Sequence, residues 1–354
     1  IALFSKLSKQ QKIDIERFTE LSYSIYRQVV KPVLNQERTI SKNKILIIPD
    51  GSLWNLNFDL LLSSDEQSVI DNSWPFLIKD YAINYQYATA LSFEEQSEKD
   101  FTQGAMLAFS YGDTEEVAGE QISFETMRSE FVELPGSRKE IRAVADIIDG
   151  DYYYGEFASE EKFKQIAKDY QIIHLAVHGN TNNENPEYSK LDFYNKSDSV
   201  EDGKLHAFEL YNMKLNADLA VLSACNTGSG KVVNGEGVLS LGRAFAYAGV
   251  NSLLLTRWEV SDAFTPKIMK VFYQELMKGK RKSDALRIAK LEFLLNADNI
   301  TSKPLYWSSF YIIGDDSPIL LHDKKAFNWW VIFAGIVFVS AIFLMILKLN
   351  RTKD

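Results

Sequence analysis

Apolar residues along the chain alternate between short continuous runs and longer stretches at helical spacing. The continuous runs at 171–177 and 218–224 predict strands that are buried on both faces. Further apolar runs predict strands at 44–48, 105–110, 251–258 and 310–314. Helical spacing predicts helices at 136–148, around 163–170, at 237–248, at 263–278, and from Ser283 as the N-cap to Leu295. Strands and helices in this order predict an α/β fold with a mostly parallel sheet and helices on both faces.

Two other stretches have a different pattern. Residues 9–31 carry apolar side chains at approximately helical spacing and stop near Pro32, which predicts a helix within a separate N-terminal segment, 1–38. The polar segment 179–204 predicts a long surface connection, and long connections often carry function. The main domain is therefore expected at 40–320.

The last part of the chain contains an uncharged run, WWVIFAGIVFVSAIFLMIL, at 329–347. A helix rises about 1.5 Å per residue, so this run would extend roughly 28 Å, close to the thickness of a bilayer core. We expect a transmembrane helix with the lipid bilayer as its partner, followed by a short polar tail at 348–354. This arrangement predicts a single-pass C-terminal anchor that leaves the main domain in the cytoplasm, although basic residues flank both sides of the span and leave the sidedness open.

Composition excludes two classes of protein. The net charge is −9 and no basic block is present, which argues against direct binding of nucleic acid. The chain has one cysteine, so it cannot be a small fold held by internal disulfides, and a free thiol fits a reducing compartment. Since the sequence begins with Ile1 rather than Met, we expect it to be the C-terminal part of a longer protein.

A histidine and the cysteine follow the two most apolar strands. His178 comes directly after the run 171–177, and Cys225 comes directly after 218–224. Sites in open parallel sheets form beyond the carboxyl ends of the strands, so an imidazole and a thiol there could share a cleft. The imidazole could take the proton of the thiol and later protonate a leaving amine. The backbone N–H groups of Gly179 and Cys225 could then hold an oxyanion.

Less specific explanations remain open for each of these residues. A lone cysteine at a strand end is often only a small buried hydrophobe, and His174, inside an apolar run, is expected to be a core histidine with its hydrogen bonds satisfied. One cysteine and four dispersed histidines predict neither a metal site nor a cofactor. The residues alone do not decide between a catalytic dyad and inert packing.

Several ordered motifs resemble one family. HLAVHG, LSACNTG and the following GEGVLSLGRAFAYAGVNSLLLTRWEVSD are similar to the CHAT domain, a caspase-like cysteine peptidase family of clan CD that is related to separase. ILIIPDGSLWNLNFDLLL, LPGSRKEIRAVADII and PLYWSSFYIIGD also resemble it, although Asn57 stands where a proline is common. The resemblance spans about 40–320. It implies a caspase–haemoglobinase fold with His178 and Cys225 as the dyad, often preceded by a helical-repeat region.

Three acidic residues are candidates for a substrate pocket. By resemblance to separase-like enzymes, Asp262 implies a preference for a basic P1 residue, while its alternative role is to cap the helix at 263–278. Asp192, in the polar segment, is a weaker candidate for the same pocket. Glu236 either holds the loop after Cys225 or is a first-turn acid of the next helix.

These features predict a membrane-anchored cysteine endopeptidase that cleaves a protein or peptide partner. By family resemblance, a regulatory protein or an upstream repeat region is expected to activate it, and its role is expected in bacterial defence or cell death. One alternative is a membrane-tethered interaction module of the same fold in which catalysis is marginal. Another is a small-molecule thiol hydrolase or amidase that uses the same dyad.

Overall fold

The structure is a computed structural model that describes residues 15–35, 43–64, 74–87, 104–112, 135–195, 200–223, 227–228, 230–233, 237–239 and 241–321. The chain divides into two compact units, Ile1–Leu320 and Leu321–Asp354, and every element described below belongs to the first. The predicted span at 329–347 and the tail at 348–354 lie outside the described residues. Within the described ranges, no helix combines the length and apolarity that crossing a bilayer requires.

The fold is built on an eight-stranded sheet with the strand order β1-β2-β13-β12-β9-β5-β3-β4. Every neighbouring pair is parallel except β12 and β13, which run antiparallel, so the expected mostly parallel α/β sheet is confirmed. Its strands are β1 (Lys44–Ile47), β2 (Ala82–Tyr85), β3 (Gly104–Ser110), β4 (Gly150–Tyr154), β5 (Tyr170–Ala176), β9 (Leu219–Leu222), β12 (Ser252–Thr256) and β13 (Phe310–Gly314). Because β5 and β9 are buried along their whole length, their continuous apolar runs follow from burial on both faces.

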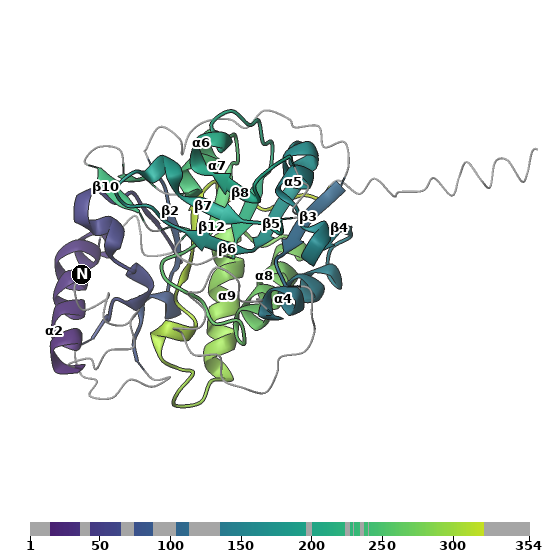
Figure 1. Cartoon of the computed structure of the whole chain (residues 1–354). Coiled ribbons are helices and arrows are strands. Elements are labelled where there is room, and N and C mark those ends of the chain that lie inside the picture. Colours follow the sequence, from purple (N-terminus) through teal and green to yellow (C-terminus); the bar gives the residue numbers. More distant parts are fainter. Residues whose placement is uncertain are drawn as a thin grey trace, which may run out of the picture. The chain divides into compact units, whose positions relative to one another are not determined.

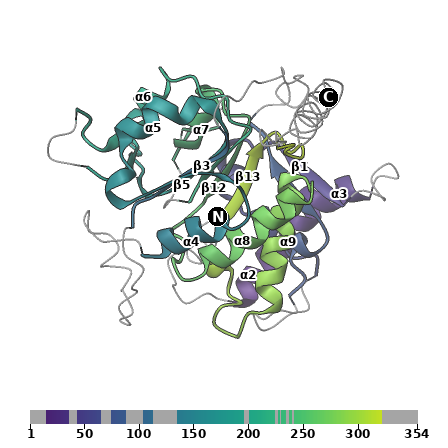
Figure 2. The ribbon, with the colours of Figure 1, turned by 90° about the vertical axis from the view of Figure 1, so that its right-hand side faces the viewer.

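Helices cover both faces of this sheet (Figure 1). Figure 2 shows α4 (Pro135–Ala145), α8 (Thr265–Met277) and α9 (Lys282–Leu295) on one face. The other face carries α5 (Glu160–Ile166), α6 (Ala207–Leu210) and α7 (Leu241–Tyr247). The short 3₁₀ segments are Gly51–Asn55, Phe58–Leu60, Leu77–Lys79, Gly155–Phe157, Ala167–Asp169, Pro186–Tyr188 and Pro304–Tyr306. The sheet therefore lies between two helical layers, which leaves its strand ends as the accessible places for a site.

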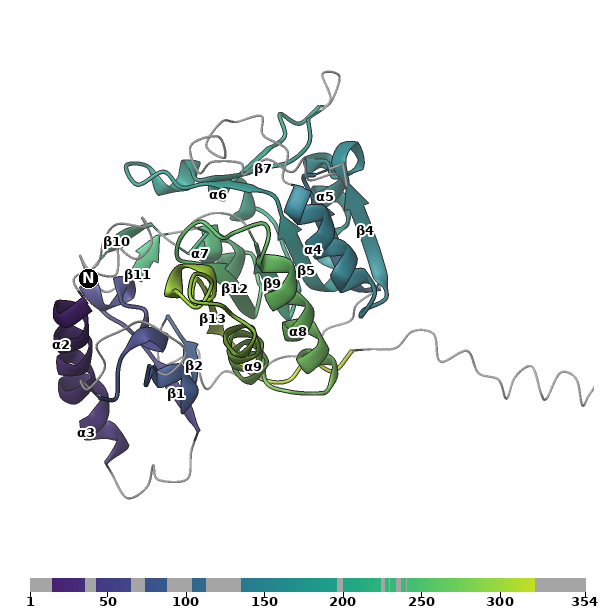
Figure 3. The same ribbon diagram turned by 90° about the horizontal axis from the view of Figure 1, so that it is seen from below.

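The N-terminal helix differs from the expected one at its end. It consists of α2 (Ile15–Ile25), a π-helical turn at Tyr26–Val30 and α3 (Lys31–Leu34), and it lies beside β1 in Figure 3. The helix does not stop at Pro32, because the proline occupies the first turn of α3, where its missing N–H needs no partner. Residues 9–14 of the predicted helix lie outside the described residues.

Two small sheets replace segments that the sequence predicted as loop or helix. The segment 179–204 was expected to be a loop, but an antiparallel sheet forms from β6 (His178–Asn180), β7 (Lys190–Asp192) and β8 (Lys204–His206). The predicted helix 237–248 begins only at Leu241, because Gly237–Leu239 is strand β11 and pairs with β10 (Lys231–Val233). Glycine and the β-branched Val238 favour the hairpin over a helix here.

Two buried carboxylates hold the helices to the sheet. The Ser283 N–H and hydroxyl both donate to Asp316, at 2.7 and 2.8 Å, so Ser283 lies inside α9 and is not its N-cap as the sequence predicted. On the same helix, the Lys290 ammonium is 1% exposed and lies 2.5 Å from the Asp59 carboxylate. Each contact joins residues far apart in sequence, so the pairs fix how α9 packs on the sheet.

Candidate active site

His178 lies just past the carboxyl end of the central strand β5. It is the first residue of β6, separated from β5 by Val177 alone, and its side chain is partly exposed. The ring of Tyr111, just past the end of β3, packs edge-on against the imidazole with 4.8 Å between ring centres. His178 therefore stands where the sequence predicted it, at a strand end with one flank held by an aromatic ring.

Cys225 lies outside the described residues, but the chain on both sides of it is described. Strand β9 pairs with β5 in parallel, with Leu175 opposite Leu222. His178 and Cys225 each come three residues after this pair. The register therefore places the ends of β5 and β9 side by side.

Thr227 and Gly228, which follow Cys225 along the chain, are held by several hydrogen bonds. The Thr227 hydroxyl donates to Leu222 O at 3.1 Å, and the Gly228 N–H donates to Thr256 O at 3.0 Å. The Tyr311 hydroxyl donates to Gly228 O at 3.1 Å and packs so closely that a Cβ on Gly228 would collide with it. These contacts hold the loop against the ends of β12 and β13.

A buried carboxylate joins the two strands beneath the site. Glu140 of α4 accepts hydrogen bonds from Ser223 Oγ at 3.0 Å and from His174 Nε2 at 2.9 Å. The Tyr273 hydroxyl of α8 lies 3.0 Å from His174 Nδ1. Both ring nitrogens of His174 therefore have a hydrogen-bond partner. His174 is thus a core histidine with satisfied hydrogen bonds, as predicted.

Glu140 differs from the other buried acids of the described residues in having no lysine partner. Asp59 pairs with Lys290, Glu160 with Lys164 and Asp316 with Lys44. Glu140 is bonded instead to Ser223 and His174. A buried charge without a counter-charge is unfavourable for folding, so its place beneath the strand ends calls for a functional explanation.

Asp262 lies past the end of β12 and against the first turn of α4. Its carboxylate accepts the backbone N–H of Gly136, and a Cβ on Gly136 would collide with the Cβ and backbone of Asp262. Burial, helped by the negative charge of Glu140, raises the pKa of Asp262 to about 6, against the lowering effect of the Gly136 N–H. Asp262 is not the N-cap of α8: that position is Phe264, without a side-chain cap. The alternative role predicted from the sequence is therefore wrong, because this aspartate contacts α4.

The other candidate residues lie around His178 or outside the described residues. Asp192 of β7 is directly opposite His178 in the strand register, and Lys190 pairs with its carboxylate at 3.1 Å. Gly179 is paired with Leu191 in the same small sheet. Glu236 lies outside the described residues. The roles of Asp192, Gly179 and Glu236 remain predictions.

One acidic group in the described part of the chain has the spacing of metal ligands. Carboxylate oxygens of Glu160, Glu201 and Glu209 lie within 4.8 Å of one another. The Lys164 ammonium lies among them, at 2.6–2.7 Å from each. A resident cation already neutralises these acids, so the trio is explained as an ion-pair cluster that ties α5 to α6.

Sequence reasoning missed Tyr111 and Glu140. Glu140 carried a weak signal, because it lies four residues before Val144 on the apolar side of its helix, where a charged residue is unexpected. Tyr111 follows a strand directly but gives no local signal, since its contact with His178 joins separate strands.

The fold places the chain among the caspase-like peptidase folds. The RgpB protein of Porphyromonas gingivalis, in a complex of its pro- and mature domains, superposes with a TM-score of 0.52 at 10% identity, covering 90% of this chain and 75% of that one. The separase of Saccharomyces cerevisiae, in complex with securin, matches with a TM-score of 0.43 at 11% identity, covering 67% of this chain and 14% of that one.

The chain belongs to the CHAT domain family, whose model matches residues 19–315. Human tetratricopeptide repeat protein 28 is 24% identical over 214 residues, which cover 52% of this chain and 8% of that protein. The mouse protein of the same name is 26% identical over 215 residues, covering 52% and 9%. The chain thus spans less than a tenth of the length of these curated relatives.

Replacing Asp262 tests whether its charge is unfavourable for folding. The folded state holds the Asp262 proton more tightly than the unfolded chain does, because the pKa of Asp262 is raised to about 6. Ionisation of Asp262 above about pH 6 therefore lowers the stability of the folded state. This loss of stability disappears as the pH falls from about 6 to 4. Asp262→Asn should therefore raise the free energy of unfolding by about 1–3 kcal/mol near pH 8 and by much less near pH 4.5.

Urea denaturation at both pH values measures this difference. Asp298→Asn is the matched control, because the exposed Asp298 carboxylate accepts hydrogen bonds from Thr301 and Ile300 and should give no gain near pH 8. If Asp262→Asn is no more stable than the unmodified protein near pH 8, the charge of the Asp262 carboxylate is offset by its surroundings and is not unfavourable for folding.

Proposed function

We propose that this protein is a cysteine endopeptidase in which Cys225 and His178 form the catalytic dyad. The supporting observation is the register of β5 and β9, since His178 and Cys225 follow the Leu175–Leu222 pair by the same number of residues. The bridge from Ser223 through Glu140 to His174 adds support, because it ties together the two strands from which the dyad extends. The CHAT family and the caspase-like fold are consistent with this activity.

In the proposed mechanism, His178 removes the proton from the Cys225 thiol and the thiolate attacks the scissile carbonyl carbon. The N–H groups of Gly179 and Cys225 hold the oxyanion of the tetrahedral intermediate. The intermediate collapses to a thioester as the imidazolium protonates the leaving amine. Water, deprotonated by His178, then hydrolyses the thioester and regenerates the thiol.

The acidic residues at the strand ends favour a substrate with a basic P1 residue. The negative charge of Glu140 acts on Asp262, and neither carboxylate pairs with a lysine or arginine within the described residues. A lysine or arginine side chain would supply the missing positive charge. Asp192 already pairs with Lys190, which makes it a poorer receptor for the same cation.

The first test compares the full-length chain with its Cys225→Ala and His178→Ala variants on a proteome-derived peptide library. New peptide termini should appear with the unmodified protein and fall by a factor of about 10³ or more in both variants. His206→Gln is the matched control, since His206 lies in β8 and should not be required.

Alkylation of Cys225 resolves the case in which no peptide is cleaved. An activated thiol reacts with iodoacetamide at a lower pH than a model thiol, and His178→Ala should remove that advantage. Equal reactivity in both proteins would reject the dyad and move the assignment to a catalytically marginal interaction module.

A second test concerns the P1 pocket. Asp262→Asn should lower kcat/KM for peptides with Arg or Lys at P1 by about 10- to 100-fold, and leave peptides with a neutral P1 residue unchanged. In the unmodified protein the preference should fade below about pH 6, because Asp262 then becomes protonated. A uniform loss across all P1 residues would instead assign Asp262 to the support of α4.

Membrane anchoring through 329–347, cytoplasmic placement of the catalytic domain and activation by a regulatory partner are further parts of the proposal. The anchor rests on the uncharged run alone. The full chain should stay with the membrane fraction after alkaline carbonate extraction, and a chain that ends at Asp323 should be released. Release of both forms would contradict the anchor.

A further inference from the structure

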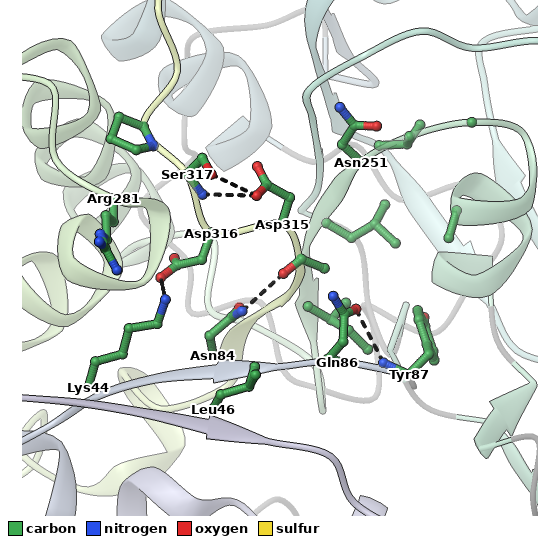
Figure 4. Close-up of a pocket in the computed structure, with 17 residues that line it drawn as sticks. Lys44, Leu46, Asn84, Gln86, Tyr87, Asn251, Arg281, Asp315, Asp316 and Ser317 are labelled. Atoms are coloured by element: carbon green, nitrogen blue, oxygen red, sulfur yellow. Dashed lines mark hydrogen bonds and ion pairs between the residues drawn. The ribbon is translucent and has the colours of Figure 1, made fainter. Parts of the chain in front are cut away.

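A cavity of about 700 Å³ lies at the opposite end of the sheet from His178 (Figure 4). Its lining includes Asn251, which precedes β12, and Gly314, which ends the antiparallel β13. His178, in contrast, follows the carboxyl end of β5, which runs parallel to β12 through β9. The cavity is therefore separate from the proposed peptidase site, and its volume lies within the range of small-molecule sites.

Two buried amide side chains of β2 and its extension line this cavity. Asn84 and Gln86 are two residues apart on an extended chain, so they lie on the same face, and they are only 2% and 5% exposed. The Asn84 Nδ2 donates to Gly314 O at 3.0 Å, but its buried Oδ1 accepts no hydrogen bond within the described residues. Buried polar atoms are rarely left unpaired, so Oδ1 calls for a donor from a ligand or solvent.

Gln86 complements that acceptor with a donor. Its Oε1 accepts the Tyr87 N–H at 3.3 Å. In Figure 4 the amide nitrogen of Gln86 points away from that bond and into the cavity. The two residues thus offer an acceptor and a donor on the same face of the chain, which can bind an N–H group and a carbonyl oxygen of one ligand.

Among the charged side chains around the cavity, one cation is left without an acidic partner within the described residues. The Asp316 carboxylate is taken by Lys44 and Ser283, and Asp315 by Lys282 and Ser317. Arg281 lies on the rim and makes no ion pair within the described residues. Its guanidinium is suited to a carboxylate or phosphate.

We propose that this cavity binds a small anionic molecule that carries an N–H donor and a carbonyl acceptor. Its N–H donates to Asn84 Oδ1, its carbonyl accepts from Gln86 Nε2, and its anionic group lies against Arg281. Apolar side chains enclose the body of the ligand, namely Leu46, Val250, Leu253 and Ile313. A peptide end with a free carboxylate and a nucleotide with an imide-bearing base share this chemistry.

Titration calorimetry on the whole chain distinguishes a peptide end from a nucleotide as the ligand. The probes are N-acetylglycine for the peptide end and uridine monophosphate for the nucleotide. Methylation of the N–H, in N-acetylsarcosine or in the N3-methyl nucleotide, should weaken binding of the preferred probe at least about 10-fold, the equivalent of 1.4 kcal/mol. If the nucleotide is preferred, uridine should bind more weakly because it lacks the phosphate.

Two substitutions connect the binding to this cavity. Asn84→Leu should weaken the preferred probe about 10-fold, and Arg281→Gln about 3- to 10-fold. Lys278→Gln is the matched control, because Lys278 belongs to the same basic stretch but does not line the cavity. Arg281 is exposed, so its substitution tests the site even if Asn84→Leu does not fold.

If neither probe binds at about 5 mM, the proposal is overturned. The Asn84 Oδ1 atom would then accept its hydrogen bond from water. Wild-type affinity in Arg281→Gln would also overturn it, because the anion would then be bound elsewhere. None of these measurements depends on peptide cleavage, so failure here and failure of the peptidase proposal are separate results.

Discussion

The buried carboxylate of Glu140 is the constraint on which the geometry of the strand ends depends. It accepts from Ser223, directly after β9, and from His174 on β5, and Tyr273 of α8 completes the series of hydrogen bonds. These side chains come from two strands and two helices, so a shift of one strand would break hydrogen bonds in a region without solvent. Leaving a buried ionised group unpaired is strongly unfavourable, and the bridge therefore holds the two strands in register.

Thr227 and Gly228, which follow Cys225, are also held by buried hydrogen bonds, but their partners are neutral. Thr227 and Thr256 exchange hydrogen bonds, and Tyr311 holds Gly228 O. Neutral hydrogen bonds contribute about 1 kcal/mol each, less than bonds to a charged group. The hydrogen bonds beneath the strand ends thus include a carboxylate acceptor, whereas those of Thr227 and Gly228 join neutral groups.

Sequence patterns predicted the two longest continuous apolar runs but missed β2, which is short although fully buried, and the elements decided by pairing. The runs at 171–177 and 218–224 are buried on both faces, so every side chain contributes to the pattern. Strand β4 was missed because it is a tyrosine-rich edge strand, and β11 because its hairpin partner β10 decides between strand and helix. His178 could be predicted because it follows a strand directly. Glu140 and Tyr111 could not, since their roles arise from contacts between distant segments.

The distribution of charge separates the parts of the molecule that serve folding from the part proposed to serve function. Asp59, Glu160 and Asp316 each have a lysine, so these carboxylates stabilise the packing of helices around the sheet. Glu140 and Asp262 have no lysine or arginine partner within the described residues, and burial together with Glu140 raises the pKa of Asp262 to about 6. A fold selected for stability alone would replace such a pair with apolar residues. In the proposed function, a basic P1 residue supplies the positive charge that Asp262 lacks.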